Sequence, residues 1–463
     1  MMGSSFRKAA FSDDFTSIID SNGNKIKISD QRVKHIWPFS ENMFNATPFV
    51  RSIFENRGWH FRFLEPSFDI MHYSKMLCSG KECPSLNLLA GMYYEDIAKN
   101  YVNHNDIFVY WGVEHACPCQ IGAWPNVWEL FSERIGKNNV IYSAFVTLEN
   151  NFLGRGLGFG TDLLKAFILG DLFDEAECVL KTIAVNKEEA LKVFKEETLK
   201  VVPSFHKGMK SLERSLQEWA DNINKIPLKA TLNETPKVLL FGGGAMVFLR
   251  GPLTEYCCQQ GVIPKIVGFH EFLLYLFSDC ARTYGFKKGY DSLDQQFNLA
   301  PLIFSLFNPK QNIGETKLAM YSYSTLIFAN SMNKRLRKAL QGSGIVYDKH
   351  VSYINILKEG HRFINNNVFS EAAVAIGKYI NSIQTDVFDG LVNIALFTCQ
   401  PSMHGLSFVR TLSHQYTIPF TGLELEGPWL SANHLRLLEN VVFQARRLRE
   451  MKNSRTTITD CLL

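Results

Sequence analysis

The stretch Ile107–Val113, with the sequence IFVYWGV, decides the fold of this chain. It is dense in β-branched and aromatic residues without polar alternation, which is typical of a strand buried on both faces of a parallel sheet. The segment Trp124–Ile135 after it has the apolar spacing of a helix, and Val140–Val146 is predicted to be the next buried strand. Strand, helix and strand in this order predict a parallel sheet with crossover helices.

The same alternation extends in both directions along the chain. Towards the N-terminus, strands over Lys34–Pro38 and His60–Leu64 flank a helix over Ala46–Asn56, and a helix over Ser85–Asn100 follows. A second alternating unit begins at Lys237, with strands predicted over Val238–Phe241, Ile263–Phe269, Val387–Phe397 and Ile418–Leu425. We therefore expect an α/β protein with two doubly wound parallel-sheet domains and an added helical region.

These patterns divide the chain into four parts. Residues 1–33 are polar and are interpreted as an N-terminal arm, and residues 34–150 as the first α/β domain. Residues 151–236 are predicted to be a helical region, because Glu188–Ile226 has the amphipathic spacing of one or two long helices. Residues 237–463 are predicted to be the second α/β domain, which ends in an amphipathic C-terminal helix.

The composition excludes several classes of protein. The 463 residues include 49 Lys and Arg against 45 Asp and Glu, so the net charge is +4, whereas nucleic-acid-binding proteins usually have a dense basic surface. The polar first residues lack the apolar core of a signal peptide, and no run of 18 apolar residues predicts a membrane span. We expect a soluble cytoplasmic protein that binds neither nucleic acid nor membranes and has no disulfide framework.

Three cysteines occupy similar places at predicted strand ends and turns. Cys119 and Cys399 each follow a predicted strand, and Cys83 comes just before a predicted helix. In an open parallel sheet the carboxyl ends of the strands form the ligand crevice, where nearby helix N-termini stabilise thiolates. The three cysteines are therefore candidate ligands of an iron–sulfur cluster. Two other interpretations stay open: three unrelated buried thiols, and a zinc site, although the cysteine spacing fits zinc knuckles poorly.

Five short segments carry a resemblance to a known family. They are SGKECP at 79–84, ACPCQIG at 116–122, ENNFLG at 149–154, KVLLFG at 237–242, and FDG at 388–390 leading to TCQP at 398–401. In this order they resemble elements of the 2-hydroxyacyl-CoA dehydratase superfamily, in particular its activase-related and double-cubane-cluster branch. The matches run from about Ile36 to Leu448, which is nearly the whole chain.

The resemblance implies a fold, a cofactor and a partner. The fold would be two Rossmann-like domains plus helices. The cofactor would be a [4Fe-4S] cluster held by Cys83, Cys119 and Cys399, or a double-cubane [8Fe-9S] cluster held by six cysteines. The activity would be ATP-dependent low-potential reduction or radical dehydration of a hydroxyacyl-CoA. Electrons would come from a separate ATP-hydrolysing activase with its own cluster, since this chain has no P-loop motif. We expect a homodimer or a heterodimer.

The sequence also departs from the family pattern. Cys117 stands where the family has Gly, Gln120 where it has Arg, and no acidic residue follows Gly242. We therefore add Cys117 and Cys78 to the candidate metal ligands. A sixth ligand would come from Cys280 or from the pair Cys257 and Cys258.

Other candidate residues lie beside these cysteines or after a strand. His115 and His404 are candidate catalytic residues, suited to deliver protons or to donate hydrogen bonds to cluster sulfur. Gly242, Gly243 and Gly244 follow a predicted strand and suit either phosphate binding or a tight turn. Two alternatives to a redox enzyme remain: a non-catalytic cluster carrier or assembly protein, and a cluster-free α/β protein that binds a phosphorylated or CoA-like ligand.

Overall fold

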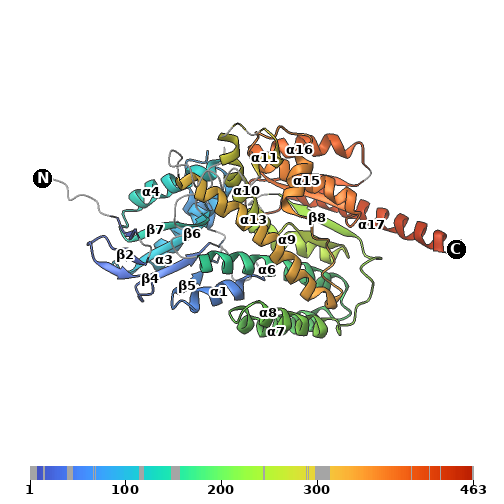
Figure 1. Cartoon of the computed structure of the whole chain (residues 1–463), viewed down its shortest axis with the longest axis horizontal. Coiled ribbons are helices and arrows are strands. Elements are labelled where there is room, and N and C mark those ends of the chain that lie inside the picture. Colours follow the sequence, from blue (N-terminus) through green and yellow to red (C-terminus); the bar gives the residue numbers. More distant parts are fainter. Residues whose placement is uncertain are drawn as a thin grey trace. The chain divides into compact units, whose positions relative to one another are not determined.

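The structure of the protein is a computed structural model (Figure 1). It describes residues 8–13, 16–38, 45–65, 67, 69–113, 119–146, 157–242, 246–287, 289, 291–297, 313–397, 399–416, 418–427 and 429–460. The chain divides into two compact units, Met1–Ala166 and Phe167–Leu463, and each is described by itself. Within the described ranges, no helix combines the length and the apolar character needed to cross a membrane.

The first unit is built on a four-stranded parallel sheet with the order β5-β4-β6-β7. Its strands are β4 (Val33–Trp37), β5 (His60–Phe63), β6 (Ile107–Val113) and β7 (Val140–Val146). Between them lie α1 (Thr47–Glu55), α2 (Ile70–Ser74), α3 (Pro84–Asn100), the 3-10 helix η1 (Gln120–Ala123) and α4 (Trp124–Ile135). Strand β6 pairs on both sides, and its Val109 and Trp111 are completely buried, as its continuous apolar run predicts.

The residues interpreted as an arm contain a small sheet of their own. Strands β1 (Ala10–Phe11), β2 (Ser17–Ile19) and β3 (Lys25–Lys27) pair antiparallel in this order. Ile18 and Ile26 are register partners and both are buried. The alternation Lys25-Ile26-Lys27 places the apolar side chain on one face and both ammonium groups on the other, which explains why so polar a segment forms strands.

The second unit is built on another four-stranded parallel sheet, with the order β11-β10-β8-β9. Its strands are β8 (Lys237–Phe241), β9 (Ile263–Ile266), β10 (Gly390–Leu396) and β11 (Phe420–Leu425). Helices α9 (Met246–Gln259) and α17 (Ala432–Asp460) share one apolar cluster with alternate strand residues such as Val238 and Leu240. Helices α15 (Glu371–Thr385) and α16 (Gln400–Ser413) share another with Leu239 and Phe241. Both faces of the sheet are therefore covered, which is the doubly wound arrangement.

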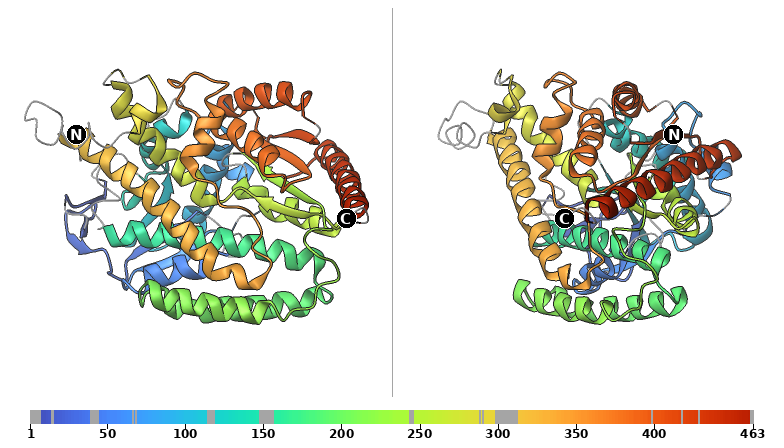
Figure 2. Two further views of the ribbon diagram at one scale, coloured as in Figure 1. Left: turned by 45° about the vertical axis from the view of Figure 1, so that its right-hand side comes forward. Right: turned by 90° about the vertical axis from the view of Figure 1, so that its right-hand side faces the viewer.

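The rest of the second unit is helical. Helix α6 (Leu157–Ile183) leads into it, and α7 (Lys187–Phe205) and α8 (Met209–Ile223) form a hairpin whose helices lie side by side in Figures 1 and 2. Besides α15, five further helices lie between β9 and β10 in the described residues. They are α10 (Phe269–Lys287), α11 (Leu293–Gln296), α13 (Ile313–Leu340), the 3-10 helix η2 (Gln341–Ser343) and α14 (Tyr353–Gly360).

Both sheets have the same strand order. Counted along the chain within each unit, the order is 2-1-3-4, and all pairs are parallel. The predicted fold class, an α/β protein with two Rossmann-like units and added helices, is confirmed. The strand order reverses between β4 and β6 in the first unit and between β8 and β10 in the second. Open sheets of this kind bind ligands at the carboxyl ends of such strands.

Candidate functional site

Cys83 and Cys119 lie on adjoining loops of the first unit. Cys119 follows β6 and is the N-cap of η1, which leads directly into α4, and Cys83 is the N-cap of α3. The Cys83 backbone N–H donates a hydrogen bond to Gln120 Oε1 at 2.6 Å, so the two loops are joined beside the two cysteines. Both cysteines are partly buried. Gln120, where the resembled family has Arg, therefore holds one cysteine loop to the other.

The loop before Cys83 is held by the carboxylate of Glu82. This group accepts hydrogen bonds from the Ser79 N–H at 2.9 Å, the Ser79 hydroxyl at 3.0 Å and the Lys81 N–H at 3.1 Å. Burial by itself would raise the pKa of Glu82, but the hydrogen bonds, first those from Ser79, lower the pKa. Gly80 has φ +83°, a conformation that favours glycine. The Gly-Lys-Glu-Cys segment is thus a compact turn that sets the position of Cys83.

Cys399 occupies the corresponding place in the second unit. It follows β10 and is the N-cap of α16, with Pro401 in the first turn. Its N–H donates to Leu396 O at 3.0 Å, and its carbonyl oxygen accepts from the Met403 N–H at 2.9 Å. Cys119 and Cys399 therefore follow the third strand of their own sheet, at the strand-order reversal.

Gly242 lies at the other side of the same reversal, at the end of β8. Its φ is +135°, and a Cβ atom there would lie 2.0 Å from Ile394 O of β10. This close approach of two backbones accounts for the glycine without a bound phosphate. Gly243 and Gly244 lie outside the described residues.

The remaining cysteines are in different surroundings. Burial, and secondly the charge of Glu82, raise the pKa of Cys78 to about 12, so its thiol stays protonated at neutral pH. Burial also raises the pKa of Cys280, in α10, to about 12. Cys257 and Cys258 lie in α9, and Cys257 belongs to the apolar cluster beneath the second sheet. None of these four is an N-cap, in contrast to Cys83, Cys119 and Cys399.

Two predicted residues, Cys117 and His115, lie outside the described residues. His404 is exposed on α16, one turn after Cys399. The predicted three-cysteine set takes Cys83 and Cys119 from the first unit and Cys399 from the second. In the described part of the chain, no three His, Cys, Asp or Glu side chains form a group that could hold a metal ion.

The donor chemistry of the three cysteines nevertheless fits a thiolate-bound cluster. A sulfur at a helix N-terminus is close to backbone N–H groups that no carbonyl of the helix uses, and these stabilise negative charge. Iron–sulfur clusters bind to cysteine thiolates, and hydrogen bonds to sulfur and partial burial adjust their potential. Three partly buried thiols at such positions provide the sulfur atoms that a cluster of this kind needs.

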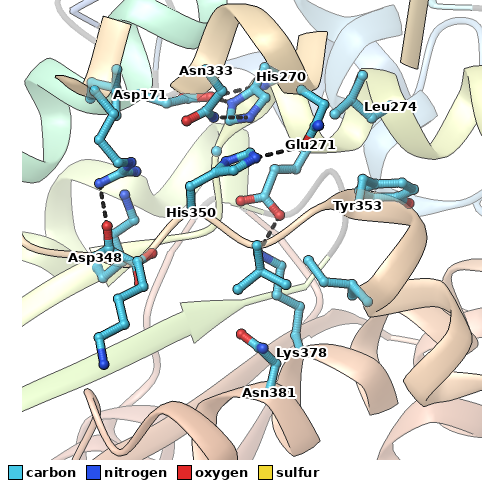
Figure 3. Close-up of a pocket in the computed structure, with 18 of the residues that line it drawn as sticks. Asp171, His270, Glu271, Leu274, Asn333, Asp348, His350, Tyr353, Lys378 and Asn381 are labelled. Atoms are coloured by element: carbon cyan, nitrogen blue, oxygen red, sulfur yellow. Dashed lines mark hydrogen bonds and ion pairs between the residues drawn. The ribbon is translucent and has the colours of Figure 1, made fainter. Parts of the chain in front are cut away.

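A second polar site in the second unit was not identified from the sequence. Figure 3 shows Asp171, His270, Asn333, Glu271 and Lys378 around one cavity. A signal for it was present in the sequence, because Asp171, Asp174 and Glu175 lie in the largely apolar middle of α6. All three acidic residues are buried, which is rare unless such groups are paired.

Known proteins give no further assignment. No protein-family model matches the chain, and no curated protein matches it either.

Proposed function

We propose that this chain holds a cysteine-ligated iron–sulfur cluster and works as a redox component, with Cys83, Cys119 and Cys399 as ligands. One observation carries the proposal: each of these cysteines is the N-cap of a helix at a sheet's carboxyl end. In addition, Cys119 and Cys399 occupy equivalent positions in two units with one strand order. Unrelated buried thiols would not be expected at equivalent, partly exposed N-caps.

The residues of the chain have defined roles in this proposal. Cys83, Cys119 and Cys399 would hold the cluster, which supplies low-potential electron transfer when bound. The Gln120 side-chain oxygen accepts a hydrogen bond from the Cys83 backbone N–H and so holds the Cys83 loop. The turn around Glu82 fixes the path of the chain into α3. His404, exposed on α16 near Cys399, is placed to exchange protons with solvent. Cys78 is left outside this set of three because it is not the N-cap of a helix.

Iron and sulfide analysis of anaerobically purified protein tests the ligand set. The wild-type chain should contain both elements in proportion, and alanine at Cys83, Cys119 or Cys399 should remove most of the iron and the associated visible absorbance. Cys178→Ala is the control, because Cys178 is buried within α6 and is not among the candidate ligands, and it should retain the wild-type iron content. Full iron retention in all three ligand variants would contradict the proposal.

We further propose that a separate ATP-hydrolysing activase supplies the electrons, because the sequence has no P-loop of its own. Adding an electron to an anionic cluster in a partly dry site is costly, and ATP hydrolysis would offset that cost. The test mixes the protein with a related activase and a reductant and follows the electron paramagnetic resonance signal of the cluster. The signal should change only with ATP, and equal reduction without ATP would reject the coupling.

A further inference from the structure

The second unit contains a small polar cavity next to the carboxyl end of β9. Its volume is about 60 Å³, which is room for roughly four to six water-sized groups. Gly268 and His270, which follow β9, form one wall, and residues of α6, α13, α14 and α15 form the others. This is the edge of an open parallel sheet where ligands usually bind. The cavity lies within one unit and contains none of the candidate cysteines.

A chain of hydrogen bonds orients one wall of the cavity. Asp171 accepts from the N–H groups of Phe269 and His270 at 3.0 and 2.9 Å, and its Oδ2 lies 2.5 Å from His270 Nδ1 (Figure 3). Burial alone would raise the pKa of Asp171, but His270 outweighs it and lowers the pKa, so the carboxylate stays ionised. We therefore assign the ring proton of His270 to Nδ1, which leaves Nε2 as an acceptor.

This assignment fixes the direction of the Asn333 amide. Asn333 Nδ2 lies 3.1 Å from His270 Nε2 and donates to it. The carbonyl oxygen Oδ1 must then point away from His270, and it is buried without a hydrogen-bond partner among the described residues. Only 6% of Asn333 is exposed. A buried hydrogen-bond acceptor that receives no donor lowers the stability of the fold by about 1–3 kcal/mol.

Two more cavity groups have unused hydrogen-bonding capacity. Burial lowers the pKa of His350 to about 4, so the ring is neutral, and its Nε2 donates to Asn330 Oδ1 at 2.6 Å, which leaves Nδ1 as an acceptor. The Tyr353 hydroxyl lies beside Ser278, but Ser278 Oγ donates to Tyr275 O at 2.8 Å. The Ser278 oxygen can still accept from the Tyr353 hydroxyl, and the tyrosine oxygen then keeps its capacity to accept a hydrogen bond from a ligand. The cavity therefore combines unused acceptors with a hydroxyl group.

The charges around the cavity balance one another. The cationic side chains that line it are Lys265, Arg337, Lys349 and Lys378, and the carboxyl side chains are Asp171, Glu271 and Asp348. Behind the lining, Glu175 pairs with both Lys265 and Arg337, and Lys378 pairs with Glu271. Four positive and four negative groups favour an uncharged ligand, because an added charge would remain uncompensated.

We propose that this cavity binds a short uncharged polyol. Hydroxyl groups both donate and accept, so one ligand can donate to Asn333 Oδ1 and His350 Nδ1 and can hydrogen-bond with the Tyr353 hydroxyl. A chain of three carbons and three oxygens fits the available volume. The Asp171–His270 pair acts as the positioning element that keeps the Asn333 oxygen directed at the ligand.

Glycerol is the probe for the test, with ligand-observed saturation-transfer NMR on the full-length protein in glycerol-free buffer. Thermal stability is not a suitable readout, because polyols stabilise most proteins by exclusion from the surface. The wild type should show saturable binding in the millimolar range. Asn333→Ala should weaken it at least fivefold, whereas Asn440→Ala should leave it within twofold, since Asn440 is an exposed residue of α17.

Tyr353→Phe is a second variant, chosen because it tests the same cavity with a smaller change to the fold. Removing the hydroxyl gives up at most its contact with Ser278, so the fold should stay intact, as circular dichroism will show, while glycerol binding weakens at least threefold. If Asn333→Ala does not fold, Tyr353→Phe decides the outcome. Binding that is not saturable in the wild type, or that is unchanged in the folded variants, overturns the proposal. Neither result depends on the iron content of the protein.

Discussion

Glu175 joins three segments of the second unit, and the change Glu175→Gln tests how much this contributes to stability. Its carboxylate accepts from Lys265 Nζ at 2.5 Å and lies 3.3 Å from Arg337 Nη1. It also accepts from the backbone N–H groups of Tyr347 and Asp348 at 2.6 and 2.7 Å. The Glu175 side chain is fully buried. Glutamine keeps the shape but removes the charge, so Lys265 is left buried without its counter-ion.

The direction of the effect follows from the pKa of Glu175. Burial alone would raise this pKa, but Lys265 and then Arg337 lower it well below 4.5. The size is that of a buried ion pair that loses one of its charges, about 3–5 kcal/mol, and we expect roughly 3 kcal/mol at neutral pH. Because the folded-state pKa is depressed, the contribution is complete above pH 4.5 and is lost as the pH falls towards 2.

Urea unfolding, followed by hydrogen exchange of peptides from α6 and α13, measures the stability of this unit directly. Glu175→Gln should lower it by about 3 kcal/mol at pH 7, and the difference from wild type should narrow below pH 4.5. Glu213→Gln is the matched control, because it breaks a partly exposed pair with Arg335 and should cost at most about 1 kcal/mol. A loss below about 1 kcal/mol for Glu175→Gln, or a difference that stays constant with pH, would refute the reasoning.

Two further stability predictions concern the cavity wall. A Cβ atom at Gly268 would lie 2.2 Å from Asp171 Oδ2, so Gly268→Ala should displace that carboxylate and cost about 2–3 kcal/mol. Gly251→Ala, in α9 where a Cβ meets nothing within 4 Å, should instead stabilise by up to about 1 kcal/mol, and thermal unfolding compares the two. The depressed pKa of His350 means that wild-type stability declines as the pH falls from 6.5 towards 4. His350→Asn should flatten this part of the pH profile, and an unchanged slope contradicts the assignment of His350 as a neutral buried ring.

Strands and helices with uninterrupted apolar patterns could be predicted closely from the sequence. The bounds of β6, α4 and β7 agree with the predicted ranges at every residue. These segments lie inside one sheet or against it, where local pattern and burial coincide. The loop cysteines could also be placed at strand ends, because an α/β alternation fixes which end of the sheet each loop occupies.

The predictions differ from the structure where distant side chains set the boundaries. Strand β9 was expected to reach Phe269 but ends at Ile266, because the Asp171 carboxylate binds the N–H groups of Phe269 and His270 and α10 starts there. A helix is predicted from the sequence over Thr161–Phe173, whereas α6 runs from Leu157 to Ile183. Its acidic residues suggest an exposed end, whereas Glu175 is paired inside the unit. The polar cavity could not be predicted for the same reason, since its groups come from helices far apart in sequence.

The shared strand order of the two units has a consequence for how this protein can change over evolutionary time. Two copies of one topology within a chain are what the duplication and fusion of an ancestral half would leave. The second unit carries six helices between β9 and β10 in the described residues, where the first carries α2 and α3 between β5 and β6. Those additional helices supply most of the cavity wall, and the first copy has no counterpart to them among its described residues. Each half can therefore acquire mutations in its own loops while the other retains the inherited chemistry, so a ligand-binding pocket can diversify without disturbing the cysteine positions.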